Sequence, residues 1–203
     1  MKIIEQRSAP NPRRVRIFLA EKGLTVPFEQ IDMMKLEHRA ASFAETNPMR
    51  QVPVLILDDG SAISESVAIC RYFEETNPEP ALFGHDAKSR ALVEMANRRM
   101  EHGLLSRVAQ VFRHTHPSMV TLEQPQVAEW GEANRSRIGE MLALMDRTLA
   151  AHAFIAGDTY SIADITALVA IDFMRPIKYA RPPELTNLAR WYDAVSTRPS
   201  AKA

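Results

Sequence analysis

The segment from residue 47 to 73, NPMRQVPVLILDDGSAISESVAICRYF, constrains the fold more than any other part of the chain. Its apolar, β-branched run Val52–Leu57 is typical of a strand. The run stops at Asp58-Asp59-Gly60, which is a strong hairpin-turn signal. We therefore expect a second short strand over Ser61–Ile63, paired antiparallel with the first.

A helix is expected directly after this hairpin, because Val67, Cys70 and Phe73 recur at helical spacing. At its start, Glu65-Ser66 would meet unpaired backbone N–H groups and the positive end of the helix dipole, which favour a carboxylate ligand. The Ser66 hydroxyl is a further donor. The alternative is that Ser64 or Ser66 caps the helix, which contributes about 1 kcal/mol. Both can hold, since capping and anion binding use the same geometry.

Pro53 lies inside the strand-like run, where it cannot donate a hydrogen bond to a neighbouring strand. Two geometries accommodate it: an ordinary edge strand, or a cis Val52–Pro53 bond, which only about 5–6% of X-Pro bonds in folded proteins adopt. A bend here would leave the backbone groups of Val52 free to pair with an extended ligand.

Residues 1–77 read as strands alternating with helices, in the order β-α-β-α-β-β-α. Asn11 and Pro12 suit the cap and the first residue of the first helix, and Gly23 suits its end. A helix between two strands makes that pair parallel, so the segment predicts a small mixed sheet of thioredoxin-like order. The elements expected before the hairpin are a strand over Lys2–Gln6, a helix over Arg13–Lys22, a strand over Pro27–Ile31 and one or two helical turns over His38–Glu45.

Residues 86–203 show no strand pattern, and we expect them to be all-helical. Ser161 and Asp164 have the spacing of a capping box, so we interpret Asp164 as a structural residue, although it precedes an apolar run and can be misread as catalytic. The expected helices cover Lys88–Phe112, Gln126–His152, the apolar run Ile165–Phe173 and Glu184–Thr197.

Composition excludes several classes of protein. Among the 203 residues, Lys+Arg and Asp+Glu balance at 25 each, so no net field favours nucleic acid or an anionic membrane. No apolar run approaches the roughly 20 residues that span a bilayer, and the first ten residues lack a secretion-signal core. A single cysteine, Cys70, forms no internal disulfide framework, and its position on the apolar face of a helix indicates a buried residue. We expect a soluble cytoplasmic protein.

No metal site is expected. His114 and His116 are two residues apart, which places them on different sides of a helix, and no cysteine or nearby carboxylate completes a set of ligands.

Taken together, these motifs resemble the cytosolic glutathione transferases, and in detail the bacterial, serine-type members with theta-like features. The resemblance covers nearly the whole chain, and its motifs occur in the order and at the spacing that the family shows. It is carried by Arg14-Val15-Arg16-Ile17-Phe18-Leu19-Ala20-Glu21-Lys22-Gly23, Asn47-Pro48, Gln51-Val52-Pro53-Val54-Leu55, Glu65-Ser66-Val67-Ala68-Ile69, and Gly157-Asp158 through Ser161-Ile162-Ala163-Asp164.

The resemblance implies a thioredoxin-like glutathione-binding domain over residues 1–77 and an all-helical domain over residues 86–203. The second domain would supply the co-substrate pocket and dimer contacts of a cytoplasmic, detoxifying homodimer. Glutathione would be a co-substrate, without any metal. By motif, the Val52 backbone beside cis Pro53 would pair with the cysteinyl unit, Glu65 and Ser66 would hold the γ-glutamyl end, and Gln51 and His38 would lie toward the glycyl carboxylate. The alternative for His38 is a solvated histidine at a helix start.

Two residues compete for the role of activating the glutathione thiol. Ser8 falls where serine-type members carry their activating residue, at the end of the first strand. A one-residue shift of the loop brings Asn11 into a plausible position. We prefer Ser8, because a hydroxyl is a compact donor to a thiolate. No tyrosine lies in the first 70 residues, which disfavours a tyrosine-type enzyme.

The co-substrate pocket is less defined. Met100, Leu104, Arg107 and Val111 share a helical face, and Met100 and Arg107 are candidates for its lining, although the same spacing describes ordinary packing. Three functions remain open. The first is conjugation of glutathione to an apolar electrophile. The second is a glutathione-dependent peroxidase or disulfide reductase on the same site. The third is a glutathione-transferase-like binding module without catalysis.

Overall fold

The computed structural model describes residues 1–203, which divide into two compact units: Met1–Ala81 with Lys202–Ala203, and Leu82–Ala201. The first unit contains strands β1 (Lys2–Glu5), β2 (Phe28–Gln30), β3 (Val54–Ile56) and β4 (Ala62–Ser64), and helices α1 (Pro10–Glu21), α2 (Ala41–Thr46) and α3 (Ser66–Thr76). The second contains helices α4 (Ala87–Met100), α5 (Ser106–Thr115), α6 (Ala128–Leu149), α7 (Ile162–Asp172) and α8 (Thr186–Ser196). No helix has both the length and the apolar character required to traverse a bilayer.

The four strands form one mixed sheet in the order β2-β1-β3-β4. β1 and β2 are parallel, with Ile3 opposite Phe28. β3 is antiparallel to both of its neighbours, and the predicted hairpin between β3 and β4 is confirmed. β3 is shorter than the expected Val52–Leu57, since it begins only after Pro53, which has no N–H to donate to a ladder.

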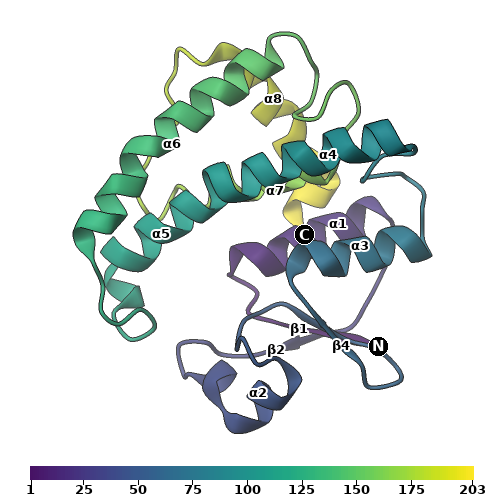
Figure 1. Ribbon diagram of the computed structural model, residues 1–203, viewed down its shortest axis with the longest axis vertical. Coiled ribbons are helices and arrows are strands. Elements are labelled where there is room, and N and C mark those ends of the chain that lie inside the picture. Colours follow the sequence, from purple (N-terminus) through teal and green to yellow (C-terminus); the bar gives the residue numbers. More distant parts are fainter. The chain divides into compact units, whose positions relative to one another are not determined.

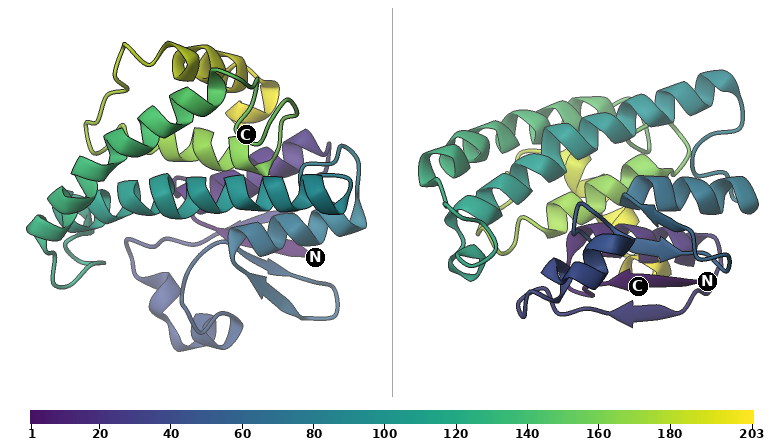
Figure 2. Two further views of the ribbon diagram at one scale, coloured as in Figure 1. Left: turned by 45° about the horizontal axis from the view of Figure 1, so that its top comes forward. Right: turned by 60° about the horizontal axis from the view of Figure 1, so that its bottom comes forward.

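The two faces of the sheet are covered by different helices. Because side chains alternate along a strand, Ile4 and Val54 point to the face on which Phe43 of α2 packs. The neighbouring residues Ile3 and Leu55 are fully buried on the opposite face. There α1 and α3 contact each other and run side by side, while α2 lies across the other face (Figures 1 and 2).

Helix α1 begins earlier than the sequence predicted. Pro10 is its first residue and Ala9 its N-cap, so Asn11 lies inside the first turn and does not cap the helix. The physical reason is that Pro10 is already fixed near helical φ and needs no N–H at this position. The predicted end is confirmed, because Gly23 adopts φ +66° directly after the C-cap Lys22.

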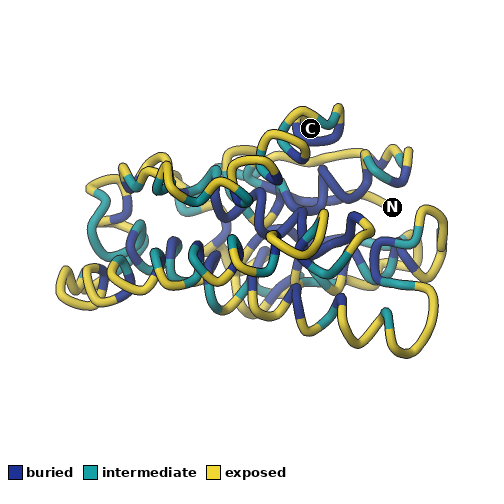
Figure 3. Tube along the Cα trace, turned by 90° about the horizontal axis from the view of Figure 1, so that it is seen from above, coloured by how far each residue is buried: buried dark blue, intermediate teal, exposed yellow.

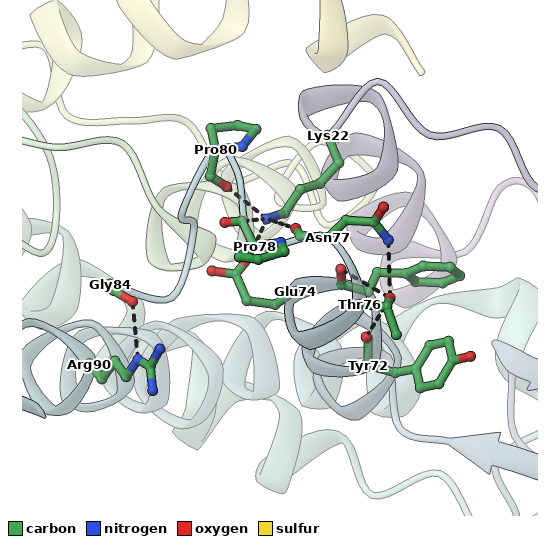
Figure 4. Close-up of polar contacts among 10 residues, drawn as sticks. Lys22, Tyr72, Glu74, Thr76, Asn77, Pro78, Pro80, Gly84 and Arg90 are labelled. Carbon is green, nitrogen blue, oxygen red and sulfur yellow. Dashed lines mark hydrogen bonds and ion pairs between the residues drawn. The ribbon is translucent and has the colours of Figure 1, made fainter. Parts of the chain in front are cut away.

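A buried lysine ties the end of α1 to the segment that follows α3. The Lys22 ammonium donates to the carbonyls of Asn77 (2.7 Å), Pro78 (3.2 Å) and Pro80 (2.7 Å), as Figure 4 shows. It also pairs with the Glu74 carboxylate at 2.5 Å. A buried charge needs such partners, so this network fixes the path of the chain after α3.

In the second unit the predicted helix over Lys88–Phe112 is interrupted. α4 and α5 are joined by a π-helical segment, Glu101–Leu105, which the hydrophobic spacing did not reveal. α5 packs along α6 and α4 along α7 (Figure 1). Exposed positions follow the outer turns of the helices, and buried positions gather on their inward sides (Figure 3).

The capping box at the start of α7 is confirmed, and its carboxylate has a wider structural role. Asp164 accepts hydrogen bonds from the backbone N–H of Ser161 (3.0 Å) and Ile155 (2.9 Å) and from the indole N–H of Trp191 (2.8 Å). Burial raises the pKa of Asp164 to about 6, and these donors oppose that shift. Asp164 therefore joins the loop before α7 to α7 itself and to α8.

Candidate functional site

The register of the sheet brings the predicted glutathione residues to one edge. Val54 of β3 pairs with both Ser64 of β4 and Ile4 of β1, antiparallel in each case. The segment before β3 therefore lies beside the segment after β4 and the loop after β1. β2 runs parallel to β1, so its carboxyl end reaches the same edge. The predicted residues that lie on these four segments are Ser8, Asn11, His38, Gln51, Val52, Pro53, Glu65 and Ser66.

The segment before β3 offers free backbone groups. The Val52–Pro53 bond is cis, the geometry that the family resemblance implies. Neither the N–H nor the carbonyl of Val52 takes part in a backbone hydrogen bond. The buried Asn47 side chain fixes the preceding turn: it donates to the Gln51 carbonyl (2.8 Å) and accepts from the Met49 N–H (3.1 Å). The turn therefore holds Val52 in a position where its own N–H and carbonyl are free to bind a ligand.

The start of α3 is strained at an exposed acidic residue. Glu65 is the N-cap and adopts φ +69° and ψ 113°, a conformation that residues other than glycine rarely take. Its side chain is exposed and makes no cap hydrogen bond. Strain of this kind persists where the surrounding structure fixes it, and it is concentrated at functional sites.

Ser66 does not cap α3, and neither does Ser64, so the capping alternative is wrong. The Ser66 hydroxyl is buried and accepts a hydrogen bond of 3.0 Å from the guanidinium of Arg14, which is fully buried on α1. Arg14 thus holds the hydroxyl of Ser66 in place and adds positive charge beneath the start of α3. Both features favour an anion at this helix terminus.

The loop that carries Ser8 is held in place by a buried arginine of α1. Arg16 of α1 donates to the Arg7 carbonyl at 2.8 Å and pairs with the fully buried Glu5 carboxylate. Burial lowers the pKa of the Arg16 guanidinium, and Glu5 opposes this effect. The Ser8 hydroxyl is exposed and accepts from the Gln6 amide (3.1 Å), which leaves its own O–H available to donate.

Asn11 is the rival donor on the same loop. Its side chain is exposed on the first turn of α1. Pro10 and Pro12 have no N–H, and the Arg13 N–H donates to the Ala9 carbonyl at 3.3 Å. The Asn11 N–H is therefore the one free backbone donor of this turn. The first turn of a helix normally leaves several N–H groups free.

His38 is not a solvated histidine at a helix start. It lies in a one-turn 3-10 helix, Glu37–Arg39, and is 5% exposed, with Nδ1 buried and without a hydrogen-bond partner. Burial, and secondly the charge of Arg39, lowers the pKa of the imidazole. Gln51, by contrast, has an exposed side chain. Their contact with glutathione stays a prediction.

Comparison with known proteins identifies the family. Residues 9–76 match the model of the glutathione S-transferase N-terminal domain, and residues 128–194 match that of the glutathione S-transferase C-terminal domain. The chain belongs to the glutathione S-transferase family. The enzyme is 36% identical over 205 residues to glutathione S-transferase 2 of Saccharomyces cerevisiae, covering 100% of this chain and 88% of that protein.

Solved structures support the same assignment. The transferase superposes on a glutathione S-transferase domain-containing protein from Marinobacter aquaeolei with a TM-score of 0.96 at 40% identity, covering 98% of this chain and 99% of that chain. Gtt2 from Saccharomyces cerevisiae gives a TM-score of 0.95 at 36% identity, covering 100% and 99%. The fold is therefore the expected thioredoxin-like α/β domain followed by an all-helical domain.

The predicted co-substrate residues of this transferase lie on different parts of the α4–α5 run. Met100 is 3% exposed and lines a cavity of about 330 Å³ between α4 and α6. Arg107 is half-buried and does not line that cavity. Of the residues predicted to share a helical face, Met100, Leu104 and Val111 are buried, whereas Arg107 is half-buried beside the fully buried Val108. The role of Met100 and Arg107 in a co-substrate pocket stays a prediction.

Cys70 is not a nucleophile in this transferase. It is fully buried in α3, and burial raises the pKa of its thiol to about 12, while Arg14 acts in the opposite direction. A thiol with this pKa stays protonated near neutral pH. Cys70 is therefore a structural residue of α3 and supplies no thiolate.

Proposed function

We propose that this transferase binds glutathione along the sheet edge defined above and holds its sulfur as a thiolate, which attacks an electrophilic carbon of an apolar molecule. Conjugation of this kind would serve detoxification. The observation that carries the proposal is the strained, exposed Glu65 beside the buried Ser66–Arg14 pair. These residues lie at the same sheet edge as the unpaired backbone of Val52.

Recognition follows from complementary groups. The α-amino group of glutathione is a cation, which suits the Glu65 carboxylate. Its α-carboxylate suits the N–H groups that begin α3 and the Ser66 hydroxyl, which Arg14 holds. The free N–H and carbonyl of Val52 supply the two hydrogen bonds of a strand-like pair to the cysteinyl unit. This pairing directs the sulfur toward the loop that carries Ser8.

Activation of the thiol requires preferential stabilisation of the anion. Lowering its pKa by about two units takes roughly 2.7 kcal/mol. One hydrogen bond to a charged acceptor supplies about 1.5–3 kcal/mol, so the Ser8 hydroxyl suffices, with help from the dipole of α1. We assign Ser8 to this role and Asn11 to a lesser one, because the Ser8 O–H has no acceptor within the protein.

Removal of the Glu65 charge tests the binding site. We expect Glu65→Gln to weaken glutathione binding in isothermal titration calorimetry by about 10- to 150-fold, the loss that corresponds to one charge-assisted hydrogen bond. Glu75→Gln is the matched control, because Glu75 is an exposed glutamate on the last turns of the same helix. Unchanged affinity in Glu65→Gln would exclude Glu65 from the site, and no binding by the parent enzyme would favour a non-catalytic module.

Product analysis separates the two reactions open to this site. With a model aryl halide and a model hydroperoxide as alternative co-substrates, we expect the glutathione conjugate of the first. Turnover of the hydroperoxide alone would assign the site to the redox reaction, in which two glutathione molecules supply the electrons because Cys70 is buried.

We further propose that the enzyme is a homodimer whose partner copy covers the apolar surface around the α4–α6 cavity. Leu92, Met95 and Leu144 line this cavity and are 41%, 42% and 37% exposed. A contiguous apolar surface of this kind is typical of an interface.

The oligomeric state tests this interface. In sedimentation velocity we expect a dimer that Met95→Glu converts to monomer, since burying the introduced carboxylate in an apolar interface carries a desolvation cost that exceeds its attraction to Arg99 on the next turn of α4. Val120→Glu, which changes an exposed residue outside the cavity, should leave the dimer intact. A monomeric parent enzyme at micromolar concentration would contradict the proposal.

A further inference from the structure

The side chain of Gln6, directly after β1, joins two segments of the first unit. It is half-buried. Its amide oxygen accepts the N–H of Met33 at 3.2 Å, and its amide nitrogen donates to the hydroxyl oxygen of Ser8 at 3.1 Å. Met33 belongs to the segment that follows β2. Gln6 therefore ties the loop that carries Ser8 to the segment after β2.

The contact with Met33 determines which way the Gln6 amide faces. A backbone N–H can only donate, so the group opposite it is the amide oxygen. The amide nitrogen then faces Ser8, and this NH2 group donates hydrogen bonds without accepting them. The Ser8 oxygen can therefore only accept from Gln6, and the proton of the Ser8 hydroxyl must point toward another acceptor.

The backbone of Ser8 is fixed independently of this side-chain contact. The Gln6 carbonyl accepts the Ala9 N–H at 2.9 Å, which closes a four-residue turn that contains Ser8. The Arg7 N–H donates to the side chain of Gln30 at 3.1 Å. The remaining freedom of Ser8 is the position of its oxygen and the direction of its O–H, and the Gln6 amide restrains both.

An oriented hydroxyl is a better donor to an anion than a freely rotating one. It needs no reorganisation when the negative charge forms. Hydrogen bonds that share one hydroxyl also polarise each other, so the bond that Ser8 accepts strengthens the bond that it donates. Both effects favour a thiolate over a neutral thiol, because a charged acceptor forms the stronger hydrogen bond.

We propose that Gln6 is a positioning residue for thiolate formation: its amide holds the Ser8 oxygen as an acceptor and so directs the Ser8 O–H to the sulfur of glutathione. This inference rests on the proposed function, in which Ser8 donates to that sulfur. Gln6 acts through Ser8 and contributes no hydrogen bond of its own to the sulfur.

Gln6→Glu reverses the polarity of this contact with little change in shape. One carboxylate oxygen still accepts the Met33 N–H, so the thermal midpoint should stay close to that of the parent. The other oxygen can only accept, so the Ser8 O–H turns toward it and away from the sulfur. When thiolate ultraviolet absorbance of bound glutathione is followed against pH, we expect the pKa of the sulfur to rise by about one to two units.

Combination with Ser8→Ala separates this effect from the field of the added charge. We expect Gln6→Glu to raise the sulfur pKa by about one unit more in the parent than in Ser8→Ala. Gln6→Met adds no charge and removes the amide that orients Ser8. It should raise the sulfur pKa by about half a unit in the parent and leave the titration of Ser8→Ala unchanged.

Equal shifts from Gln6→Glu in the two backgrounds would overturn the role of Gln6, because the added charge alone would then account for them. A lower thermal midpoint in Gln6→Met without any change in the titration would make Gln6 a structural residue only. In both cases Ser8 keeps its assigned role. If Ser8→Ala by itself leaves the titration unmoved, the assignment of Ser8 is wrong, and the role of Gln6 is overturned with it.

Discussion

Arg16→Met is expected to lower the free energy of unfolding by about 3–5 kcal/mol, the loss that follows when one partner of a buried ion pair is removed. The Glu5 carboxylate is fully buried, and without Arg16 it keeps only the hydrogen bond of 2.8 Å from the Gln30 amide. The same change releases the Arg7 carbonyl, which Arg16 holds at 2.8 Å. The loop before α1 should therefore loosen, and transferase activity should fall more than stability alone explains.

A double-mutant cycle measures how strongly Glu5 and Arg16 depend on each other. In urea denaturation followed by circular dichroism, we expect Glu5→Gln/Arg16→Met to be more stable than Arg16→Met alone, because no unpaired charge remains buried. Additive losses in the two single variants would contradict a direct coupling between Glu5 and Arg16.

Ser8→Ala is expected to lower kcat/KM for conjugation by about 10- to 150-fold at pH 6.5, which is the effect of losing one hydrogen bond to a charged acceptor. The deficit should shrink as the pH rises past about 8.5, the ordinary pKa of a thiol, because the thiolate then forms without assistance. Asn11→Ala serves as the control on the same loop and should lose less than threefold. A deficit in Ser8→Ala that is independent of pH would indicate a positioning role instead of thiol activation.

The fold could be predicted closely where its determinants are local. Asp58-Asp59-Gly60 predicted the hairpin, and Gly23 predicted the end of α1. The spacing of Ser161 and Asp164 predicted the capping box at the start of α7. Each of these signals depends on the conformation of a few neighbouring residues. The sheet edge could also be anticipated, because the order of strands and helices determines which chain segments meet there.

The hydrogen bonds and ion pairs that hold the site could not be predicted, because each joins side chains of different elements that only the folded chain brings together. Arg14 reaches Ser66 across 52 positions, and Arg16 reaches Glu5 beneath the Ser8 loop. In the sequence, arginines within a helix look like ordinary surface residues. The strain at Glu65 and the π-helical segment after Met100 likewise arise from packing and leave no composition signal.

Thiolate absorbance of bound glutathione, followed against pH in the ultraviolet, tests the central claim most directly. In the parent enzyme we expect the sulfur to titrate about two units below free glutathione, the shift that roughly 2.7 kcal/mol of anion stabilisation produces. In Ser8→Ala the titration should return toward that of the free tripeptide. A bound thiol that titrates as it does in solution, or a lowered pKa that Ser8→Ala leaves unchanged, would contradict the proposed activation by Ser8.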